Sequence, residues 1–342
     1  MELRTGLRIL DRAPHAVQVG TDERWSVTVD GLTPQERTAL LGLGDGPAGR
    51  RPRWASSEDA PHRLQSVLDD LTDAGLLQES PAATGPAGLG SPLDDEVVAL
   101  QVAGAGTRET VGVRRDRRVG VVGLGRIGMV VVDVLASAGV GTFLLDDPRR
   151  VRRADVGVGG LRERHVGAAR AHCAADVLGR EHPDARVGSG TRETPDVVVI
   201  VFEEAADPVR TARLMMEEVP HLPVVVREGD VVVGPFVVPG RSACLTCLDM
   251  HRTDMDPGWP ALAAQLRAIG STHPAPQPSV VASVAGGAAA AQVLAFLDGQ
   301  DPAATGTALE VRGPDARPRV RRWSVHPGCG CTDLLGADVP RA

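Results

Sequence analysis

The sequence has 342 residues and contains no lysine and no tyrosine, so all 37 basic side chains are arginine. Without lysine, the protein cannot form the Schiff base of pyridoxal-phosphate enzymes or class I aldolases. It also cannot carry the lysine of a P-loop nucleotide site. Arginine does not titrate near neutral pH, so any general acid or base must be His, Asp, Glu or Cys.

Aromatic residues make up only 2% of the chain, which predicts a core built from Val, Leu and Ala. The net charge of −7 disfavours extensive binding to nucleic acid. The N-terminus has no apolar signal region, and the uncharged segment 279–297 is rich in Ala and Gly. We interpret that segment as a buried helix and not as a membrane span, and we expect a cytoplasmic protein.

The pattern along the chain predicts two domains, at residues 1–80 and 95–335, with a small-residue linker at 81–94 and a tail at 336–342. The first domain begins with three short strand-like runs. A helix should start at Thr33-Pro34-Gln35-Glu36, which has the form of a capping box. A second amphipathic helix follows near 64–75. These elements predict a small α+β domain of the winged-helix type.

Winged-helix domains commonly bind DNA, but the charge of this one argues against that function. Residues 1–80 contain nine Arg and thirteen acidic side chains, several of them on or beside the second helix. Phosphates would repel such a helix. The seam between sheet and helix in such a domain can instead accept a peptide as an added strand.

A glycine-rich turn opens the second domain. Residues 118–122 form a strand-like run that leads into G-x-G-x-x-G at Gly123, Gly125 and Gly128, followed by a helix and a strand ending in Asp146-Asp147. This order predicts a Rossmann-like α/β fold, with Asp146 placed to meet a ribose hydroxyl. The same turn also serves as plain packing, so occupation by a ligand is left open.

Two short-spaced cysteine pairs are the strongest chemical signal in the sequence. They are Cys244 and Cys247 in C-L-T-C, and Cys329 and Cys331 in C-G-C. Four thiolates of this spacing are typical of a closed, structural zinc site. Cys173 is interpreted as a buried small residue.

The second domain resembles the ThiF/MoeB/ubiquitin-activating superfamily, on the evidence of the glycine turn, Asp146 and the cysteine pairs. More narrowly, the chain resembles the ThiF-like proteins of azole-modified peptide (TOMM) pathways. The segments that carry this likeness are Gly234–Gly240, Cys244–Arg252, Asp256–Leu266 and His326–Cys331. The resemblance implies a mixed-sheet ThiF-type domain with the four-cysteine zinc site, preceded by a winged-helix peptide-clip domain.

Active adenylating members of the superfamily differ from this chain at several positions. Arg126 replaces the second glycine of their turn, Asp155 stands in the place of an asparagine, and Arg170 stands in the place of a lysine. Their magnesium-binding aspartate falls in 202–207, where the sequence does not identify an equivalent. Adenylation needs a cation and metal clamp on the triphosphate. The resemblance therefore implies a vestigial or weak nucleotide site, and a scaffold more than a catalyst.

We expect the protein to bind the leader of a ribosomal precursor peptide and to present it to a YcaO-type cyclodehydratase for thiazole or oxazole formation. The leader should contact two groups of residues, one on the third predicted strand and one on the second helix. These are Trp25, Val27 and Val29, and Leu64, Val67, Leu68 and Leu71.

Two other functions stay open. One is an active ATP-dependent adenylyltransferase that uses Asp146 for ribose and Arg126 and Arg170 for phosphates. The other is an NAD-dependent oxidoreductase that uses the same glycine turn. A homodimer is also left open.

Overall fold

The computed structural model describes residues 2–4, 6–43, 62–78, 91–188 and 193–332. The chain divides into two compact units, Met1–Glu109 and Thr110–Ala342. Helix α3 (Asp94–Val102) therefore belongs to the first unit, although the sequence placed it at the start of the second domain. The Gly44–Arg53 stretch, most of the predicted linker and the predicted tail lie outside the described residues.

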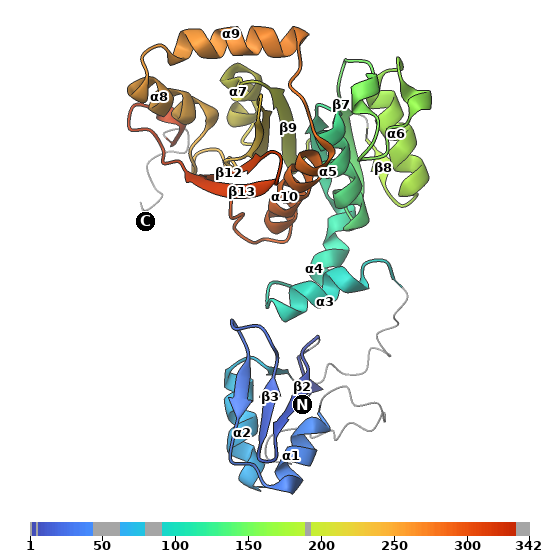
Figure 1. The fold of residues 1–342 in the computed structure, drawn as a ribbon, viewed down its shortest axis with the longest axis vertical. Helices are drawn as coiled ribbons and strands as arrows, with labels where there is room; N and C mark the ends of the chain where they lie inside the picture. The colour runs from blue at the N-terminus through green and yellow to red at the C-terminus, as the bar shows by residue number, and fades with distance from the viewer. Residues whose placement is uncertain (1, 5, 44–61, 79–90, 189–192, 333–342) are drawn as a thin grey trace. The chain divides into compact units, whose positions relative to one another are not determined.

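The first unit contains a three-stranded antiparallel sheet in the order β2 (Ile9–Ala13), β3 (Ala16–Val19) and β4 (Val27–Val29). A second, two-stranded sheet pairs β1 (Glu2–Leu3) with β5 (Leu77–Gln78). Helices α1 (Pro34–Leu41) and α2 (His62–Asp73) complete this part of the unit (Figure 1). An α+β architecture is thus present. The finer assignment to the winged-helix type stays a prediction.

The predicted start of helix α1 is confirmed in detail. Glu36 donates its backbone N–H to Thr33 Oγ1 at 3.3 Å, and Thr33 N donates to Glu36 Oε2 at 2.8 Å. This reciprocal pair satisfies two backbone donors that the first helical turn leaves without partners. Pro34 at the first helical position needs no donor partner. Local sequence alone therefore determines where this helix begins.

The second unit is built on an eight-stranded mixed sheet in the order β13-β12-β11-β10-β9-β6-β7-β8. Five neighbouring strands are parallel: β10 (His221–Val226), β9 (Val197–Glu203), β6 (Arg118–Val122), β7 (Thr142–Asp146) and β8 (Arg186–Val187). Strands β11 (Asp230–Val233), β12 (Thr307–Arg312) and β13 (Arg317–Arg322) extend the sheet with antiparallel pairing. The predicted α/β fold with a mixed sheet is confirmed.

Two hydrophobic cores cover the two faces of this sheet, and strand β9 contributes to both. Val197, Val199 and Val201 point into the larger core, whereas Val198 and Ile200 point into the smaller one. Burial on both faces explains why this strand is a continuous apolar run. The larger core contains helices α5 (Arg126–Ser137), α6 (Arg170–Glu181) and α10 (Ser279–Leu297).

The smaller core receives side chains from helices α7 (Pro208–Met216) and α8 (Leu245–Met255). Helix α9 (Trp259–Thr272) follows α8 along the chain and is drawn at the top of Figure 1. Helix α4 (Arg108–Val113) spans the boundary between the two units. Short helices complete the second unit: η2 (Arg114–Asp116), η3 (Arg153–Asp155), η4 (Glu163–His165) and η5 (Gly330–Thr332).

Helix α10 is long and apolar enough to cross a membrane by length and composition, and half of its most apolar window is buried. It packs tightly against α5: a Cβ added to Gly286 would lie 2.6 Å from Val130 Cγ1. Ala282, Ala285 and Ala289 are completely buried beside it. These contacts support its interpretation as a core helix whose small residues permit close approach.

Candidate functional site

The glycine-rich turn lies between β6 and α5, where the sequence placed it. Gly123 has φ +93°, a conformation that side chains other than glycine rarely adopt. A Cβ on Gly128 would lie 2.0 Å from the Gly123 carbonyl oxygen. Gly125 precedes the first residue of α5. Glycine is therefore required at Gly123 by the backbone conformation and at Gly128 by close backbone packing, whether or not a ligand binds.

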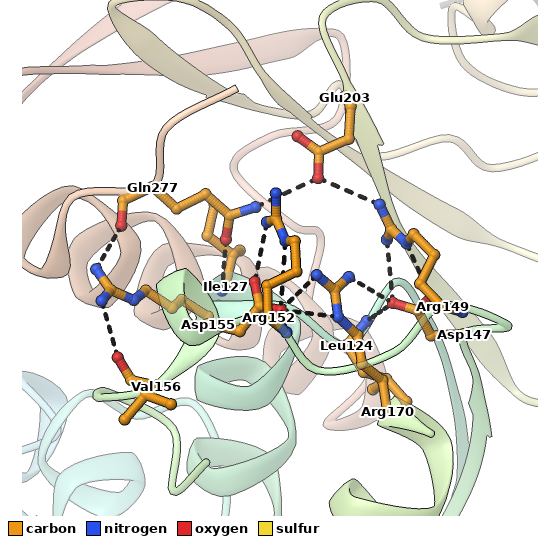
Figure 2. A network of polar contacts seen from close by, with 11 residues as sticks. Leu124, Ile127, Asp147, Arg149, Arg152, Asp155, Val156, Arg170, Glu203 and Gln277 are labelled. Atoms are coloured by element: carbon orange, nitrogen blue, oxygen red, sulfur yellow. Dashed lines mark hydrogen bonds and ion pairs between the residues drawn. The ribbon is translucent and has the colours of Figure 1, made fainter. Parts of the chain in front are cut away.

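The N-terminus of α5 is covered by the segment that precedes α10. Ile127 N donates to Gln277 Oε1 at 3.3 Å, a contact visible in Figure 2. Arg126 Nη1 donates to the Gln277 carbonyl oxygen at 3.0 Å, and Arg126 Nη2 donates to Val156 O at 2.8 Å. A helix N-terminus favours anions through its unpaired N–H groups. Here Gln277 and two backbone carbonyls engage donors that phosphate would otherwise use.

Arg170, the first residue of α6, is 1% exposed and faces two buried carboxylates. Its Nη1 donates to Asp147 Oδ2 at 3.0 Å. Its Nε and Nη2 donate to Asp155 Oδ2 at 3.1 and 2.6 Å. All three guanidinium nitrogens are thus committed to internal ion pairs (Figure 2). The sequence analysis named Arg170 and Asp155 as departures from the adenylating members, but it did not anticipate that these two side chains would pair with each other.

Asp147 organises this network and was missed as a site residue. It accepts Leu124 N at 2.8 Å, and Arg149 donates to it through Nε at 2.9 Å and Nη2 at 3.0 Å. Burial opposes ionisation of this carboxyl, but the hydrogen bonds from Arg149 and Leu124 outweigh it and hold the pKa of Asp147 well below its usual range. The Asp-Asp pair after β7 was the available signal. Asp146, the chosen member of the pair, is exposed.

Glu203 ends strand β9 with a side chain only 7% exposed. Its Oε1 accepts Arg149 Nη1 at 3.4 Å and Gln277 Nε2 at 3.5 Å, whereas Oε2 has no hydrogen-bond partner among the described residues. Burial raises the pKa of this carboxyl. The sequence could not choose among the residues of 202–207, and the structure identifies Glu203 as the buried acid of that segment.

A cleft of about 270 Å³ lies at the carboxyl ends of β6, β7 and β9. The sheet order β9-β6-β7 makes this the point where successive crossovers diverge, and ligands of open α/β sheets bind at such a point. Asp146, Arg149, Glu203, Asp207 and Arg210 are among the charged residues that line it. The cleft has carboxylates that could meet hydroxyl groups, but Arg126 and Arg170 are not among its lining residues.

The four predicted metal-ligating cysteines come together at the start of α8 and the end of the described chain. The Sγ atom of Cys244 lies 3.8 Å from the Sγ atom of Cys247 and 3.8 Å from that of Cys329. The Sγ atom of Cys247 lies 3.4 Å from that of Cys331. Four sulfurs about 2.3 Å from a tetrahedral zinc ion would lie about 3.8 Å apart. The cluster therefore has the size that such an ion requires and could hold a metal.

The thiols of this cluster have pKa values that are shifted in both directions: burial opposes ionisation of Cys247, but backbone hydrogen bonds with His326 and Cys244 lower its pKa. Burial raises the pKa of Cys329 to about 11 and displaces the pKa of Cys331 upward as well. Buried thiols with such values stay protonated at neutral pH unless a positive charge stabilises their thiolates. The remaining cysteine, Cys173, is buried in the larger core, as predicted.

A second group of metal-ligand types, His251, Asp254 and His326, lies within 4.8 Å of one another. Gly328 N donates to His326 Nδ1 at 3.0 Å, so Nε2 carries the ring proton and faces Asp254 Oδ2 at 2.8 Å. Both ring nitrogens of His326 are therefore used. Through these hydrogen bonds His326 ties the loop of Cys329 to α8.

The predicted peptide-contacting residues divide into two sets. Leu64, Leu68 and Leu71 are at most 2% exposed and form the core of the first unit, so they cannot form an open peptide-facing surface. This corrects the expectation from the amphipathic pattern, because the apolar face of α2 packs against its own sheet. The other predicted residues are half-buried: Trp25, Val27, Val29 and Val67. Strand β4, which carries Val27 and Val29, is an edge strand among the described residues.

Comparisons with solved structures show a similar fold over nearly the whole chain. Escherichia coli MccB with MccA-N7isoASN is 15% identical, with a TM-score of 0.72, and 97% of this chain covers 99% of that one. Escherichia coli MccB with ATP gives a TM-score of 0.71 at 15% identity and the same coverage. PaaA gives a TM-score of 0.65 at 17% identity, with 93% of this chain covering 99% of that chain.

No curated protein sequence matches this chain. A comparison with protein-family models matches residues 99–331 to the ThiF family. That range contains the glycine turn, the buried Arg170 network and all four clustered cysteines. The chain belongs to the ThiF family.

Proposed function

We propose that this protein binds a ribosomally made precursor peptide and presents it to a YcaO-type cyclodehydratase, without adenylating the peptide itself. A peptide partner is supported by the fold that the chain shares with MccB, a microcin C7 biosynthetic enzyme solved in complex with N-formylated MccA. The YcaO partner, the azole product and a homodimer rest on the sequence resemblance.

The observation that carries the non-adenylating part of the proposal is the engagement of both candidate phosphate ligands. Arg170 is 1% exposed and gives all three nitrogens to Asp147 and Asp155. Arg126 donates to backbone carbonyls, and Gln277 occupies Ile127 N. Stabilising a triphosphate in the transition state requires preorganised cations and donors that face it. Here those groups face protein atoms.

For the peptide we propose the edge of β4 as the binding site. An added strand would take its main-chain hydrogen bonds from Val27–Val29 and contact the half-buried Trp25 at one end. Of the α2 residues, Val67 is half-buried and suits such a contact better than the three core leucines. The cysteine cluster would hold zinc as a structural ion that joins the C-terminal segment to α8.

The test is a binding measurement with the full-length protein and the fluorescently labelled precursor peptide encoded beside its gene. Trp25→Ala should weaken binding about tenfold or more, because aromatic anchors dominate such interfaces. Trp259→Ala, in the second unit, serves as the control and should bind as the unaltered protein does. Absence of saturable binding, or equal binding by both variants, would refute the proposed peptide site.

An adenylyltransferase stays the second candidate because of two acidic side chains at the cleft. Glu203 Oε2 is buried without a partner among the described residues, and Asp146 is exposed at the end of β7. MccB also has a structure with ATP. Pyrophosphate exchange that depends on the precursor peptide and is abolished in Asp146→Ala would establish this candidate and exclude the scaffold. An NAD-dependent oxidoreductase would instead change the fluorescence of added NADH.

A further inference from the structure

Strand β13 presents an unusual edge at one end of the eight-stranded sheet. It pairs with β12 on one side only and has no strand on its other side among the described residues (Figure 1). All six of its residues, Arg317–Arg322, are exposed. A strand of this length leaves a row of backbone N–H and C=O groups unpaired, which is a template for another strand.

The direction of those backbone groups follows from two observations. Trp323 N donates to Gly306 O at 2.8 Å, so the odd-numbered residues of this strand direct their backbone groups toward β12. Pro318 has no N–H and belongs to the even-numbered set, as expected for proline at a sheet edge. Val320 and Arg322 consequently direct both N–H and C=O outward, on the free edge.

The side chains on this edge are strongly basic, in a chain whose net charge is −7. Glu310 accepts Arg321 Nε at 2.8 Å and Arg312 Nη2 at 3.1 Å, which neutralises part of the charge. The guanidinium groups of Arg317, Arg319 and Arg322 have no carboxylate partner among the described residues. Between them Val320 is 66% exposed, an unusual position for a large apolar side chain on an edge strand.

We propose that the β13 edge is a docking site for an acidic, extended peptide segment, which adds to the sheet as a further strand. The unpaired guanidinium groups match carboxylates in charge, and the outward groups of Val320 and Arg322 match a peptide backbone. A nucleic acid fits less well, because its phosphates would meet outward carbonyl oxygens as well as arginines. This site lies in the second unit and is independent of the peptide site proposed at β4.

The experiment measures the fluorescence anisotropy of a labelled peptide, Glu-Val-Glu-Val-Glu-Val-Glu, titrated with the full-length protein at low salt. Two variants separate the contributions of charge and backbone. Arg319→Glu with Arg322→Glu reverses two unpaired charges, and Val320→Pro removes one outward N–H without touching the pairing to β12. Each should weaken binding about tenfold. Arg115→Glu with Arg164→Glu makes the same change in net charge at exposed positions elsewhere and should leave binding unchanged.

Fold and stability of the variants are checked by circular dichroism and thermal melting. As a measurement that needs no variant, a backbone N-methylated form of the peptide should bind the unaltered protein about tenfold more weakly, because it cannot pair with β13. Equal binding by the matched control and the Arg319/Arg322 variant would overturn the proposal. So would a preference for oligo-dT that Val320→Pro does not alter, or no binding at all. In the last case the arginines only protect the edge from aggregation.

Discussion

Replacing Arg170 with methionine separates a structural role of this side chain from a role in holding phosphate. The variant leaves Asp147 and Asp155 buried without the cation that joins them, while Arg149 and Arg152 still pair with one carboxylate each. Removing one partner of a buried ion pair costs about 3–5 kcal/mol. The two remaining arginines place the expected loss of unfolding free energy near the lower limit, about 3 kcal/mol.

Thermal unfolding gives a direct measure of this loss. For a unit of this size, about 3 kcal/mol corresponds to a decrease in Tm of about 6–12 °C. Arg180→Met on the same helix is the matched control, since the Arg180 side chain is 59% exposed and, among the described residues, pairs only with Asp176 one turn away. Its effect should stay below about 0.5 kcal/mol.

The carboxyl groups of Asp147 and Asp155 determine how the difference in stability between the unaltered protein and Arg170→Met depends on pH. Their pKa values are lowered in the folded protein, so the stability they contribute is fully present above the ordinary aspartate value of 3.8 and is lost as the pH falls through the lower folded values. The difference in Tm between the unaltered protein and Arg170→Met should therefore be largest at neutral pH and shrink below about pH 4.

A phosphate-binding role of Arg170 predicts a different result. If Arg170 holds phosphate, Arg170→Met should melt like Arg180→Met without nucleotide and should lose a stabilisation that ATP gives to the unaltered protein. A Tm within about 1 °C of the control at pH 7 would refute the internal ion-pair network as the main role of this residue.

Three further predictions concern the glycine turn, the Gln277 side chain that covers it and the cysteine cluster. Gly128→Ala should destabilise the protein by about 2 kcal/mol or more, since its Cβ would lie 2.0 Å from a backbone oxygen. Gly287→Ala, which has open space around it in α10, should stabilise the protein by up to about 1 kcal/mol, and chemical denaturation measures both changes. Gln277→Ala should raise the affinity for inorganic triphosphate several-fold in calorimetric titration, because it frees Ile127 N at the start of α5, and unchanged affinity would contradict this account of the turn. Cys247→Ser should reduce bound zinc from about one equivalent to a small fraction by elemental analysis and lower the Tm, whereas Cys173→Ser should retain the metal; equal zinc in both variants would exclude the four-cysteine site.

Local signals in the sequence were sufficient for several elements. The capping box at Thr33 fixed the start of α1, and the glycine spacing fixed the turn at Gly123. The two cysteine pairs identified a cluster whose members come from distant parts of the chain. Such patterns can be predicted because a cap, a tight turn or a metal-ligand set is defined by residue types at short spacing.

The amphipathic pattern of residues 64–75 correctly predicted a helix, but the peptide-binding surface expected on its apolar face was wrong. Its leucines are apolar because they form the core of the first unit, and helical periodicity does not distinguish a core face from a binding face. The sheet that covers them comes from residues 9–29, and only their packing decides which apolar side chains remain accessible.

The sequence by itself determined the family, the mixed α/β fold and the identity of the clustered cysteines. Only the tertiary structure decided whether the charged residues near the glycine turn are available to a ligand. Arg170 is engaged because η3 brings Asp155 beside it, and Ile127 N is engaged because Gln277 arrives from far along the chain. The free energy of an ionic or polar group depends on the partners that surround it in space, and those partners are set by long-range packing.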